Sequence, residues 1–491
     1  MQAPAELTAD QEQAAATFLH WLAAPADGRP FVLSGYAGTG KTFLSMRLLA
    51  AAEAAGLCWT VAAPTHKAVG VLRRNLAQAG LSPTWFPATI HRLLRLKLRR
   101  QGDLERCEET EQTAGALEHL GLVLLDEASM VDAALLEITL RCAHPFRTRL
   151  VFVGDPAQLP PVGEPASPVF GMERAAAAEL RHVVRHQGPV LRLATGIREQ
   201  HLPCRRPPPL PPIRTARGAV ALLAEPEWLA AAQDALRRSG ETDNPDLARI
   251  LCYTNRRLEQ LVPIARRALH GAMADQLPVL PGEVLISRAA VMAPACREGE
   301  EQAEEPDMVL GSNRELVVRD VTPERCDLAD FGVGSGDGCS PAVIDTLTAE
   351  VEAGETRLAL RLLPPAGSEP RRALDAVLAR LRQQAREAGK TEGRGLWRRY
   401  FLVRDAFASL GPAAVLTVHR SQGSTFGEVF IAGDVFWPSD EVLRRQLVYV
   451  AVSRASQAVW LVAAGASSSS SSSASAAADR QRWEGWLRQG A

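Results

Sequence analysis

Short apolar runs that end in small or polar residues recur through the first 190 residues of the chain. They are FVLSG at 31–35, CWTVAAPT at 58–65, LVLLDEAS at 122–129 and RLVFVGDP at 149–156. Runs of this kind are typical of strands buried on both faces, and the helical stretches between them indicate parallel connections. Residues 1–190 are therefore predicted to form an α/β domain around a parallel sheet.

A second series of such runs follows the first. It comprises ARILCYTN at 248–255, AAVLTVHRSQG at 413–423, EVFIAGDV at 428–435 and AVWLVAA at 458–464. This series predicts a second α/β domain in two parts, residues 191–282 and 406–466. A proline-rich run at 205–212 is expected to be a polyproline connector.

The segment between these two parts, residues 283–405, differs in composition. It contains an acidic stretch at 298–307, a glycine-rich patch at 331–340 and a helical run near 368–390. We predict a small inserted domain that is rich in β-structure and has a helical excursion.

The end of the chain, residues 467–491, begins with seven serines and finishes in a short helix candidate that carries two tryptophans. Because a run of serines cannot pack, the linker is expected to be a flexible tether. The tail itself is expected to be a frayed, dispensable end. The alternative is docking of its tryptophan face on this protein or on a partner protein.

Composition limits the class of protein. The chain has 491 residues, 46% hydrophobic and 23% charged, and a mean hydropathy of −0.06, as in soluble globular proteins. No apolar run approaches the roughly 20 residues of a membrane span, and the N-terminus lacks the features of a secretory signal. Eight cysteines without a CxxC pair favour reduced thiols in a cytoplasmic protein. A net charge of −1 argues against a broadly basic nucleic-acid coat but allows a groove with local contacts.

Residues 35–42, GYAGTGKT, match the pattern of a phosphate-binding loop between a predicted strand and a predicted helix. Glycines let backbone N–H groups surround phosphates, and the helix N-terminus adds positive charge. Lys41 is expected to reach the β- and γ-phosphates of ATP, and Thr42 to bind Mg²⁺. The predicted nucleotide-binding residues of this loop are Gly35, Gly38, Thr39, Gly40, Lys41 and Thr42. The alternative is an ordinary glycine-rich turn.

Asp126 and Glu127 stand at the carboxyl end of the apolar run LVLLDEAS. Taken alone, an acidic pair in this place is often only a solvated strand end. Behind a phosphate-binding loop, Asp126 is expected to hold Mg²⁺ through water, and Glu127 to polarise the attacking water. Together the two motifs predict a Mg²⁺-dependent ATPase.

Seven motifs occur in order along the chain. They are GYAGTGKT, APTHKAV (63–69), ATIHRLL (88–94), LLDEASMVD (124–132), GDPAQLPPVG (154–163), LTVHRSQGSTF (416–426) and YVAVSRA (449–455). Over about residues 7–465, this series resembles the superfamily-one DNA helicases of the RecD/Dda-like branch. The resemblance implies two RecA-like P-loop motor domains with a pin hairpin insertion and a small β-rich, SH3-like insertion. It also implies a monomeric motor that uses ATP to move 5′→3′ on single-stranded DNA and to unwind duplex DNA, in DNA repair, recombination or replication.

The resemblance assigns roles within these motifs. Gln11 is similar to the glutamine that reads the adenine edge, Gly423 is a nucleotide contact, and Gln158 is similar to the γ-phosphate sensor. Arg454 is similar to an arginine finger delivered from the second motor domain. Arg185 in HVVRHQ aligns with the other such arginine, although the family usually has an aromatic residue before it and Gln after it. An arginine from a facing domain makes hydrolysis depend on domain closure.

The DNA-facing residues that the resemblance implies lie at strand ends, where hydroxyl, imidazole and cationic groups suit phosphate and sugar contacts. They are Pro64, Thr65, His66, Lys67, Thr89 and His91 in the first motor domain, and Thr417, His419, Ser421 and Gln422 in the second. The alternative for the three histidines is capping of a helix or turn. Single-stranded DNA and duplex junctions are the predicted partners, and a membrane is not.

Residues 94–109 alternate apolar and charged side chains on both sides of Gln101-Gly102-Asp103. The alternation predicts a hairpin within about residues 92–112. At this location the family carries a small pin that separates the strands. The alternative is an exposed hairpin of no consequence.

Two other functions stay open from the sequence. One is the helicase subunit of a RecBCD-like exonuclease complex, for which a partner would supply the nuclease. The other is an ATP-switched nucleic-acid clamp or remodeller that does not unwind.

Overall fold

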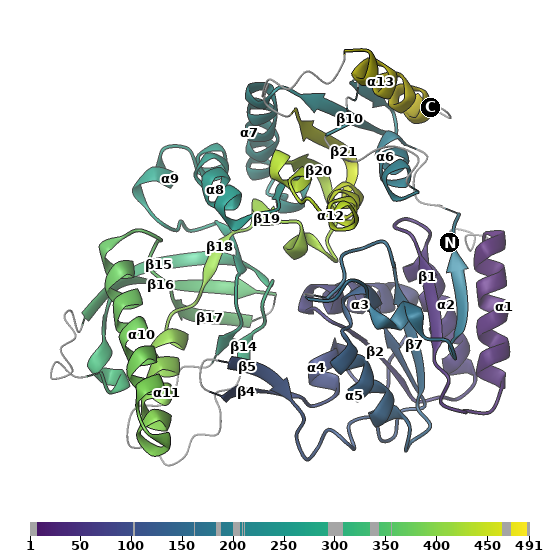
Figure 1. Ribbon diagram of the computed structural model, residues 1–491, viewed down its shortest axis with the longest axis horizontal. Helices are drawn as coiled ribbons and strands as arrows, with labels where there is room; N and C mark the ends of the chain where they lie inside the picture. The colour runs from purple at the N-terminus through teal and green to yellow at the C-terminus, as the bar shows by residue number, and fades with distance from the viewer. Residues whose placement is uncertain are drawn as a thin grey trace. The chain divides into compact units, whose positions relative to one another are not determined.

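The computed structural model describes residues 7–101, 104–161, 163–182, 188–199, 207–208, 210, 212–292, 308–333, 343–354, 356–463 and 473–488. The chain divides into two compact units (Figure 1). The larger unit consists of Met1–Lys97, Glu109–Leu269 and Val415–Ala491, and the smaller one of Leu98–Glu108 and His270–Ala414.

The N-terminal part of the larger unit is a six-stranded, wholly parallel sheet in the order β3-β2-β6-β7-β1-β8. Its strands are β1 (Phe31–Gly35), β2 (Trp59–Ala63), β3 (Ala88–Thr89), β6 (Leu122–Leu125), β7 (Arg149–Gly154) and β8 (Ala176–Leu180). The four apolar runs of the sequence are β1, β2, β6 and β7, and almost every residue in them is buried. The predicted parallel α/β domain is confirmed.

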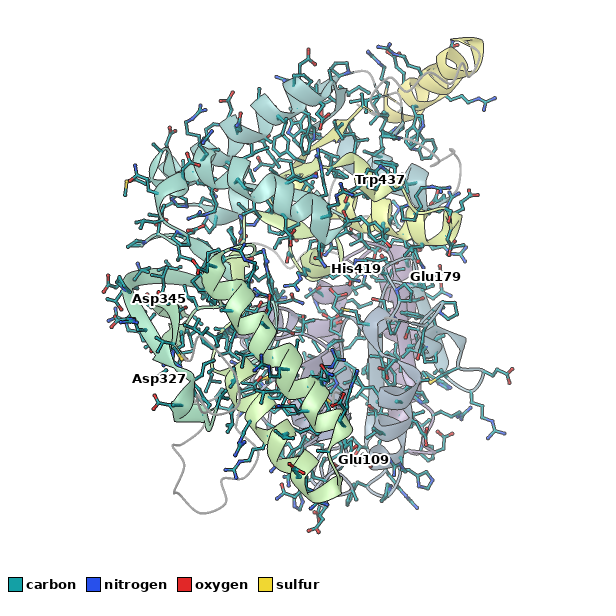
Figure 2. All side chains as sticks on the ribbon, turned by 60° about the vertical axis from the view of Figure 1, so that its left-hand side comes forward. Glu109, Glu179, Asp327, Asp345, His419 and Trp437 are labelled. Carbon is teal, nitrogen blue, oxygen red and sulfur yellow. The ribbon has the colours of Figure 1, made fainter. Side chains whose placement is uncertain are left out.

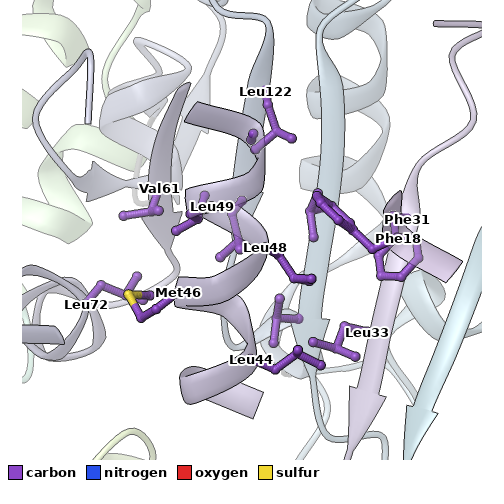
Figure 3. Packing of buried hydrophobic residues seen from close by; sticks show 14 of the residues in the cluster. Phe18, Phe31, Leu33, Leu44, Met46, Leu48, Leu49, Val61, Leu72 and Leu122 are labelled. Carbon is purple, nitrogen blue, oxygen red and sulfur yellow. The ribbon is translucent and has the colours of Figure 1, made fainter. Parts of the chain in front are cut away.

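Helices cover both faces of this sheet. They are α1 (Ala9–Ala23), α2 (Lys41–Ala54), α3 (His66–Ala79), α4 (Ile90–Leu93) and α5 (Ala133–Ala143). On one face, Leu44 of α2 lies beside Leu33 of β1, and the rings of Phe18 and Phe31 meet edge-on at 5.3 Å (Figure 3). On the other face, α5 packs against Phe152 of β7. This packing fixes the turns that leave the carboxyl ends of the strands, where ligands bind in such sheets.

The second part of the larger unit is another six-stranded sheet, in the order β19-β11-β20-β21-β10-β9. All its pairings are parallel except that of the edge strand β9. Its strands are β9 (Ile213–Thr215), β10 (Gly218–Leu223), β11 (Ala248–Cys252), β19 (Val415–Thr417), β20 (Phe426–Ile431) and β21 (Ala455–Val462). The helices around it are α6 (Pro189–Arg198), α7 (Glu225–Glu241), α8 (Asn255–His270) and α12 (Glu441–Ser453). After the predicted architecture, the domains built on these two sheets are called below the first and the second RecA-like domain.

The smaller unit contains a five-stranded antiparallel sheet in the order β17-β16-β15-β12-β18. Its strands are β12 (Val284–Ser287), β15 (Glu315–Asp327), β16 (Val343–Ala353), β17 (Thr356–Arg361) and β18 (Leu410–Pro412). The helical pair α10 (Glu369–Glu387) and α11 (Lys390–Asp405) packs its apolar side on this sheet through Leu374 and Leu381. A β-rich insertion with helices was predicted and is present; its likeness to an SH3 domain stays a prediction.

Smaller elements complete this unit. The short helix α9 (Met273–Gln276) precedes the sheet, and β13 (Val291–Met292) pairs with β14 (Met308–Leu310). The strands β4 (Lys97–Gln101) and β5 (Leu104–Glu108) form a two-stranded sheet where the sequence predicts a hairpin. The predicted turn residues Gly102 and Asp103 lie outside the described residues.

The C-terminal tail is a docked helix, so the expectation of a frayed end is wrong. In α13 (Ser473–Arg488), Trp483 and Leu487 are each only 1% exposed. The indole Nε1 of Trp486 donates to the Arg192 carbonyl on α6 (2.8 Å), and the Arg192 guanidinium donates back to the Trp486 carbonyl (3.0 Å). Gly196 of α6 allows this approach, because a Cβ there would lie 2.8 Å from the same indole nitrogen. The tryptophan-bearing face of the helix thus docks on α6, although a low-complexity linker precedes it in the sequence.

Among the described residues, no helix combines the length and the apolar character needed to cross a membrane.

Candidate functional site

The phosphate-binding loop joins β1 to α2 at the carboxyl edge of the first sheet. Gly38 and Gly40 have φ angles of +84° and +82°, in the left-handed region that glycine tolerates. Gly35 has no room for a side chain, because a Cβ would lie 2.9 Å from the Cβ of Leu180. The described residues supply no side-chain cap at the start of α2. The helix therefore offers its first N–H groups to an anion.

The Lys41 ammonium lies inside this loop. Its Nζ donates to the carbonyl oxygens of Gly35 (2.7 Å) and Tyr36 (2.9 Å). The Tyr36 carbonyl also accepts the hydroxyl of Thr39 (2.8 Å). Thr42 is exposed in the first turn of α2. The loop thus brings together a cation, helix N–H groups and an accessible hydroxyl, the groups that bind a triphosphate.

Gln11 connects α1 to the same loop. Its backbone N–H and side-chain oxygen form a capping box with Thr8, and its Nε2 donates to the Thr39 carbonyl (2.9 Å). A Cβ at Gly40 would lie 2.5 Å from that Nε2, so glycine is required there as well. Gln11 is buried, and in this structure both ends of its amide serve internal hydrogen bonds. The structure thus shows it holding the loop, and its adenine contact stays a prediction.

Asp126 and Glu127 follow β6 in the middle of the sheet. Glu127 has a φ of +53°, which turns the chain sharply at this point, and its N–H donates to the Asp126 carboxylate (2.8 Å). Burial, together with the charge of Glu127, raises the pKa of Asp126 to about 7, against the smaller opposing effects of the Glu127 N–H and Lys41. A buried carboxyl of this kind is stabilised by a bound cation.

Asp155 and Gln158 lie in the loop after β7. The Asp155 carboxylate accepts the Ala157 N–H (3.0 Å) through one oxygen and the Tyr449 hydroxyl (2.6 Å) through the other. Gln158 is 6% exposed, and its side-chain oxygen is buried without a hydrogen-bond partner among the described residues. An unsatisfied buried acceptor calls for an explanation, and a bound water or ligand group would supply one.

Arg454 follows the last residue of α12 in the second RecA-like domain. It is 6% exposed and donates to the carbonyls of Val450 and Ser424, both at 3.2 Å. Burial lowers the pKa of its guanidinium, and the negative charge of Glu127 is the largest influence that opposes this shift. Gly423 has a φ of +72°, and a Cβ there would lie 3.9 Å from the Glu127 carboxylate. Residues of both RecA-like domains therefore meet at Glu127.

Arg185, the second arginine assigned from the sequence, lies outside the described residues.

The predicted DNA-facing residues of the first domain lie at the ends of β2 and β3. Thr65 and Thr89 are helix N-caps, whose hydroxyls accept the N–H groups of Ala68 and Arg92. Pro64, His66 and Lys67 are half-buried, and the Lys67 ammonium lies 5.4 Å from the centre of the Phe426 ring. Burial lowers the pKa of His91, an effect that the charge of Asp132 opposes.

In the second domain, the predicted residues follow β19. Thr417 is 7% exposed, and Ser421 is fully buried with its hydroxyl donating to the Val418 carbonyl (2.7 Å). Gln422 is also buried, and its amide lies 3.4 Å from the Leu159 carbonyl, next to Gln158. The Gln422 contact therefore joins the two domains in this structure, whereas the Ser421 hydroxyl bonds within the second domain.

His419 and Trp437 lie on the yellow-green C-terminal part of the ribbon (Figure 2). The His419 ring is 6.1 Å from that of Tyr253 at the end of β11, and burial lowers the pKa of its imidazole. Tyr253 is half-exposed, and Trp437 is 70% exposed. Aromatic rings at strand ends are suited to stacking on nucleic-acid bases.

Three residues at or near the phosphate-binding loop, Tyr449, Asp155 and Arg198, were not predicted from the sequence as part of the site. The Tyr449 hydroxyl accepts the Ala37 N–H (2.9 Å) while bonded to Asp155. The Arg198 guanidinium, 5% exposed, lies with its Cζ 3.2 Å from the centre of the Tyr36 ring. Tyr449 and Asp155 lie within two of the seven motifs, so motif membership could have marked them as candidate site residues. Arg198 stands in no motif.

The fold and the phosphate-binding loop are those of a P-loop nucleotide hydrolase. Comparisons with known proteins narrow the class. The AAA domain family model matches residues 6–203, and the UvrD-like helicase C-terminal domain model matches residues 412–462. With these matches and its seven ordered motifs, the chain is similar to the superfamily-one helicases of the RecD/Dda type.

The similar proteins cover different shares of the chain. The ATP-dependent DNA helicase Dda of Enterobacteria phage T4 is 23% identical over 437 residues, 88% of this chain and 93% of Dda. The ATP-dependent RecD2 DNA helicase of Deinococcus radiodurans is 31% identical over 35% of this chain, and the RecBCD enzyme subunit RecD of Mycolicibacterium smegmatis is 33% identical over 34%. The matches span only 22% of RecD2 and 32% of that RecD subunit. A solved structure of Bacteroides Pif1 helicase with ADP-AlF3 and single-stranded DNA is 14% identical, with a TM-score of 0.45, over 93% of this chain and 92% of the Pif1 chain.

Proposed function

We propose that the protein is an ATP-dependent DNA helicase that moves 5′→3′ on single-stranded DNA and unwinds duplex DNA. One observation carries the proposal: Gly423 of the second RecA-like domain lies beside Glu127 of the first, and the charge of Glu127 acts on the guanidinium of Arg454. When a site is completed by two domains, each cycle of hydrolysis is tied to their relative movement. Dda and RecD2, which are similar over most and over part of this chain, are ATP-dependent DNA helicases by name.

ATP and Mg²⁺ are the proposed cofactors. The exposed Thr42 hydroxyl and the buried Asp126 carboxyl are the groups that would hold the metal, which when bound neutralises charge on the phosphates. Lys41 then binds the β- and γ-phosphates, and Glu127 orients the water that attacks. Arg454 stabilises the charge that spreads over the γ-phosphoryl oxygens.

Single-stranded DNA and duplex junctions are the proposed partners of a monomeric, cytoplasmic motor. Groups at strand ends, such as the half-buried Lys67 and the exposed His419, suit contacts with phosphates and sugars that ignore base sequence. The helical pair α10–α11 adds a basic region. Residues 369–405 hold ten basic and five acidic residues, a net charge of +5, whereas the whole chain carries −1. Such a region attracts nucleic-acid phosphates.

Strand displacement on tailed duplexes tests this proposal. We expect ATP hydrolysis stimulated by single-stranded DNA, and displacement of a duplex with a 5′ single-stranded tail but not of one with a 3′ tail. Displacement from the 3′ tail alone would contradict the polarity. Stimulated hydrolysis without displacement of either duplex would contradict unwinding and favour an ATP-switched clamp.

A further inference from the structure

The peptide that joins Tyr36 to Ala37 in the phosphate-binding loop is held from two sides. Its carbonyl accepts the Lys41 ammonium (2.9 Å) and the Thr39 hydroxyl (2.8 Å) inside the loop. Its N–H, on Ala37, donates to the hydroxyl of Tyr449 (2.9 Å). Because the C=O and N–H of a trans peptide point in opposite directions, these bonds fix which way the peptide faces. The orientation of this peptide in turn sets where Lys41 rests.

The Tyr449 hydroxyl has both its donor and an acceptor site in use. It donates its only proton to the Asp155 carboxylate at 2.6 Å, a short and charge-assisted hydrogen bond, and its oxygen accepts the Ala37 N–H. Tyr449 is 1% exposed. Burial, with the Asp155 carboxylate, raises the pKa of the hydroxyl well above its ordinary value, so the donor is retained at any working pH.

We propose that Tyr449 is a positioning residue for ATP hydrolysis, whose hydroxyl connects the phosphate-binding loop to the two elements that respond to the γ-phosphate. Asp155 belongs to the loop that carries Gln158, and Tyr449 belongs to the helix that ends at Arg454. One hydroxyl thus joins the peptide that directs Lys41, the Gln158 loop and the arginine helix. The inference rests on the proposed function and extends it to a residue outside the assigned roles.

A second contact from the second domain keeps the loop in place when this hydroxyl is removed. The Arg198 guanidinium lies over the Tyr36 ring, and α6, which carries it, is bonded to α12 through Arg445 and the Ile197 carbonyl (3.1 Å). Figure 1 shows α6 and α12 side by side. Loss of the Tyr449 hydroxyl should therefore change the alignment of the loop during hydrolysis rather than the fold.

The test is Tyr449→Phe in the full-length chain, with Tyr400→Phe as the matched control. Tyr400 packs with Trp397 and Phe401 in the smaller unit, at 5.5 and 5.2 Å between ring centres. With saturating single-stranded DNA, we expect Tyr449→Phe to lower kcat roughly tenfold, because a buried N–H and a buried carboxylate lose their shared partner. KM for ATP and the affinity for a non-hydrolysable analogue should stay within about twofold of wild type. Tyr400→Phe should match the wild-type protein in all three.

A double-variant cycle with Asp155→Asn separates positioning from plain stability. If the hydroxyl works through Asp155, Tyr449→Phe should add little to the kcat loss of Asp155→Asn. Fully additive losses would overturn the proposal, as would an unchanged kcat in Tyr449→Phe. A lower melting temperature with an unchanged kcat per analogue-binding site would likewise overturn it, in favour of a structural role. If the wild-type protein itself lacked DNA-stimulated turnover, the proposed function would fail first and this inference with it.

Discussion

Glu127 and Lys41 approach the same nucleotide from different sides, so their losses should differ in kind. Lys41→Ala should weaken nucleotide binding, because it removes the ammonium from the centre of the phosphate-binding loop. Glu127→Gln should keep the affinity for ATP and slow turnover on the order of 100-fold or more, as expected for a lost general base. Equilibrium binding of a fluorescent ATP analogue, together with steady-state hydrolysis, distinguishes the two. The exposed Glu137 of α5 provides a control, Glu137→Gln, which should leave both measurements at wild type. Wild-type turnover in Glu127→Gln would remove Glu127 from the site.

His419 should make stability depend on pH. Partial burial of its ring holds the pKa of the imidazole below the ordinary 6.5, so the folded protein keeps it neutral at a pH where the unfolded chain becomes protonated. Its neutral form therefore favours folding in full above about pH 6.5, and stability falls as the pH drops below that value. As the pH is lowered from 8 to 5.5, the melting temperature of His419→Gln should fall less steeply than that of the wild-type protein. Identical slopes for the two proteins would refute the prediction.

At this scale, the sequence predicts residue types better than their contacts. Lys41, Glu127 and Arg454 follow from motifs, because phosphate chemistry restricts which side chains can serve. The bonds of Gln11 to Thr39 and of Tyr449 to Ala37 do not follow from any local pattern, since each joins segments distant in the chain.

Among the elements, α13 should stabilise the second RecA-like domain. Trp483→Ala removes a side chain that is 1% exposed. In protein cores such a truncation lowers the free energy of unfolding by ~3–5 kcal/mol, and here the loss cannot exceed the free energy with which α13 docks. We expect the melting temperature to fall by a few degrees, and residues 473–488 to become sensitive to brief trypsin treatment. Trp437→Ala, at a position 70% exposed, should change neither. Equal protease resistance in both variants would mean that α13 does not depend on Trp483.

The hairpin β4–β5 should be needed for unwinding but not for hydrolysis. Opening a base-pair step costs on the order of 1.4 kcal/mol, which an element at the fork can couple to ATP-driven steps. Replacing residues 97–106 with a short Gly-Ser turn should preserve ATPase stimulated by single-stranded DNA and abolish strand displacement. If the shortened protein displaces strands at the wild-type rate, the separating element lies elsewhere, and the 283–405 insertion is the next candidate.

For the whole molecule, apolar runs bounded by turn residues predicted most strands of the two RecA-like sheets, because strands buried on both faces leave a strong signal in a single sequence. The edge strands β3 and β9 are short and carry no such signal. The tail helix was misjudged because its binding surface on α6 depends on Gly196 and Arg192, far away in the chain. The antiparallel sheet of the insertion was expected only in outline, because its long strands β15 and β16 mix buried and exposed positions irregularly.

The central claim is that the second RecA-like domain completes the ATP site, and Arg454→Ala tests it most directly. Because the charge of Glu127 acts on the Arg454 guanidinium from the first domain, loss of Arg454 should reduce kcat by roughly 10³-fold, the scale of an arginine finger. Affinity for a non-hydrolysable ATP analogue should change only a few-fold, since Lys41 and the loop glycines remain. Arg237→Ala, which removes an exposed arginine paired with Asp234, should behave as wild type. Turnover of Arg454→Ala within about twofold of wild type, in a protein with an unchanged melting temperature, would contradict the account.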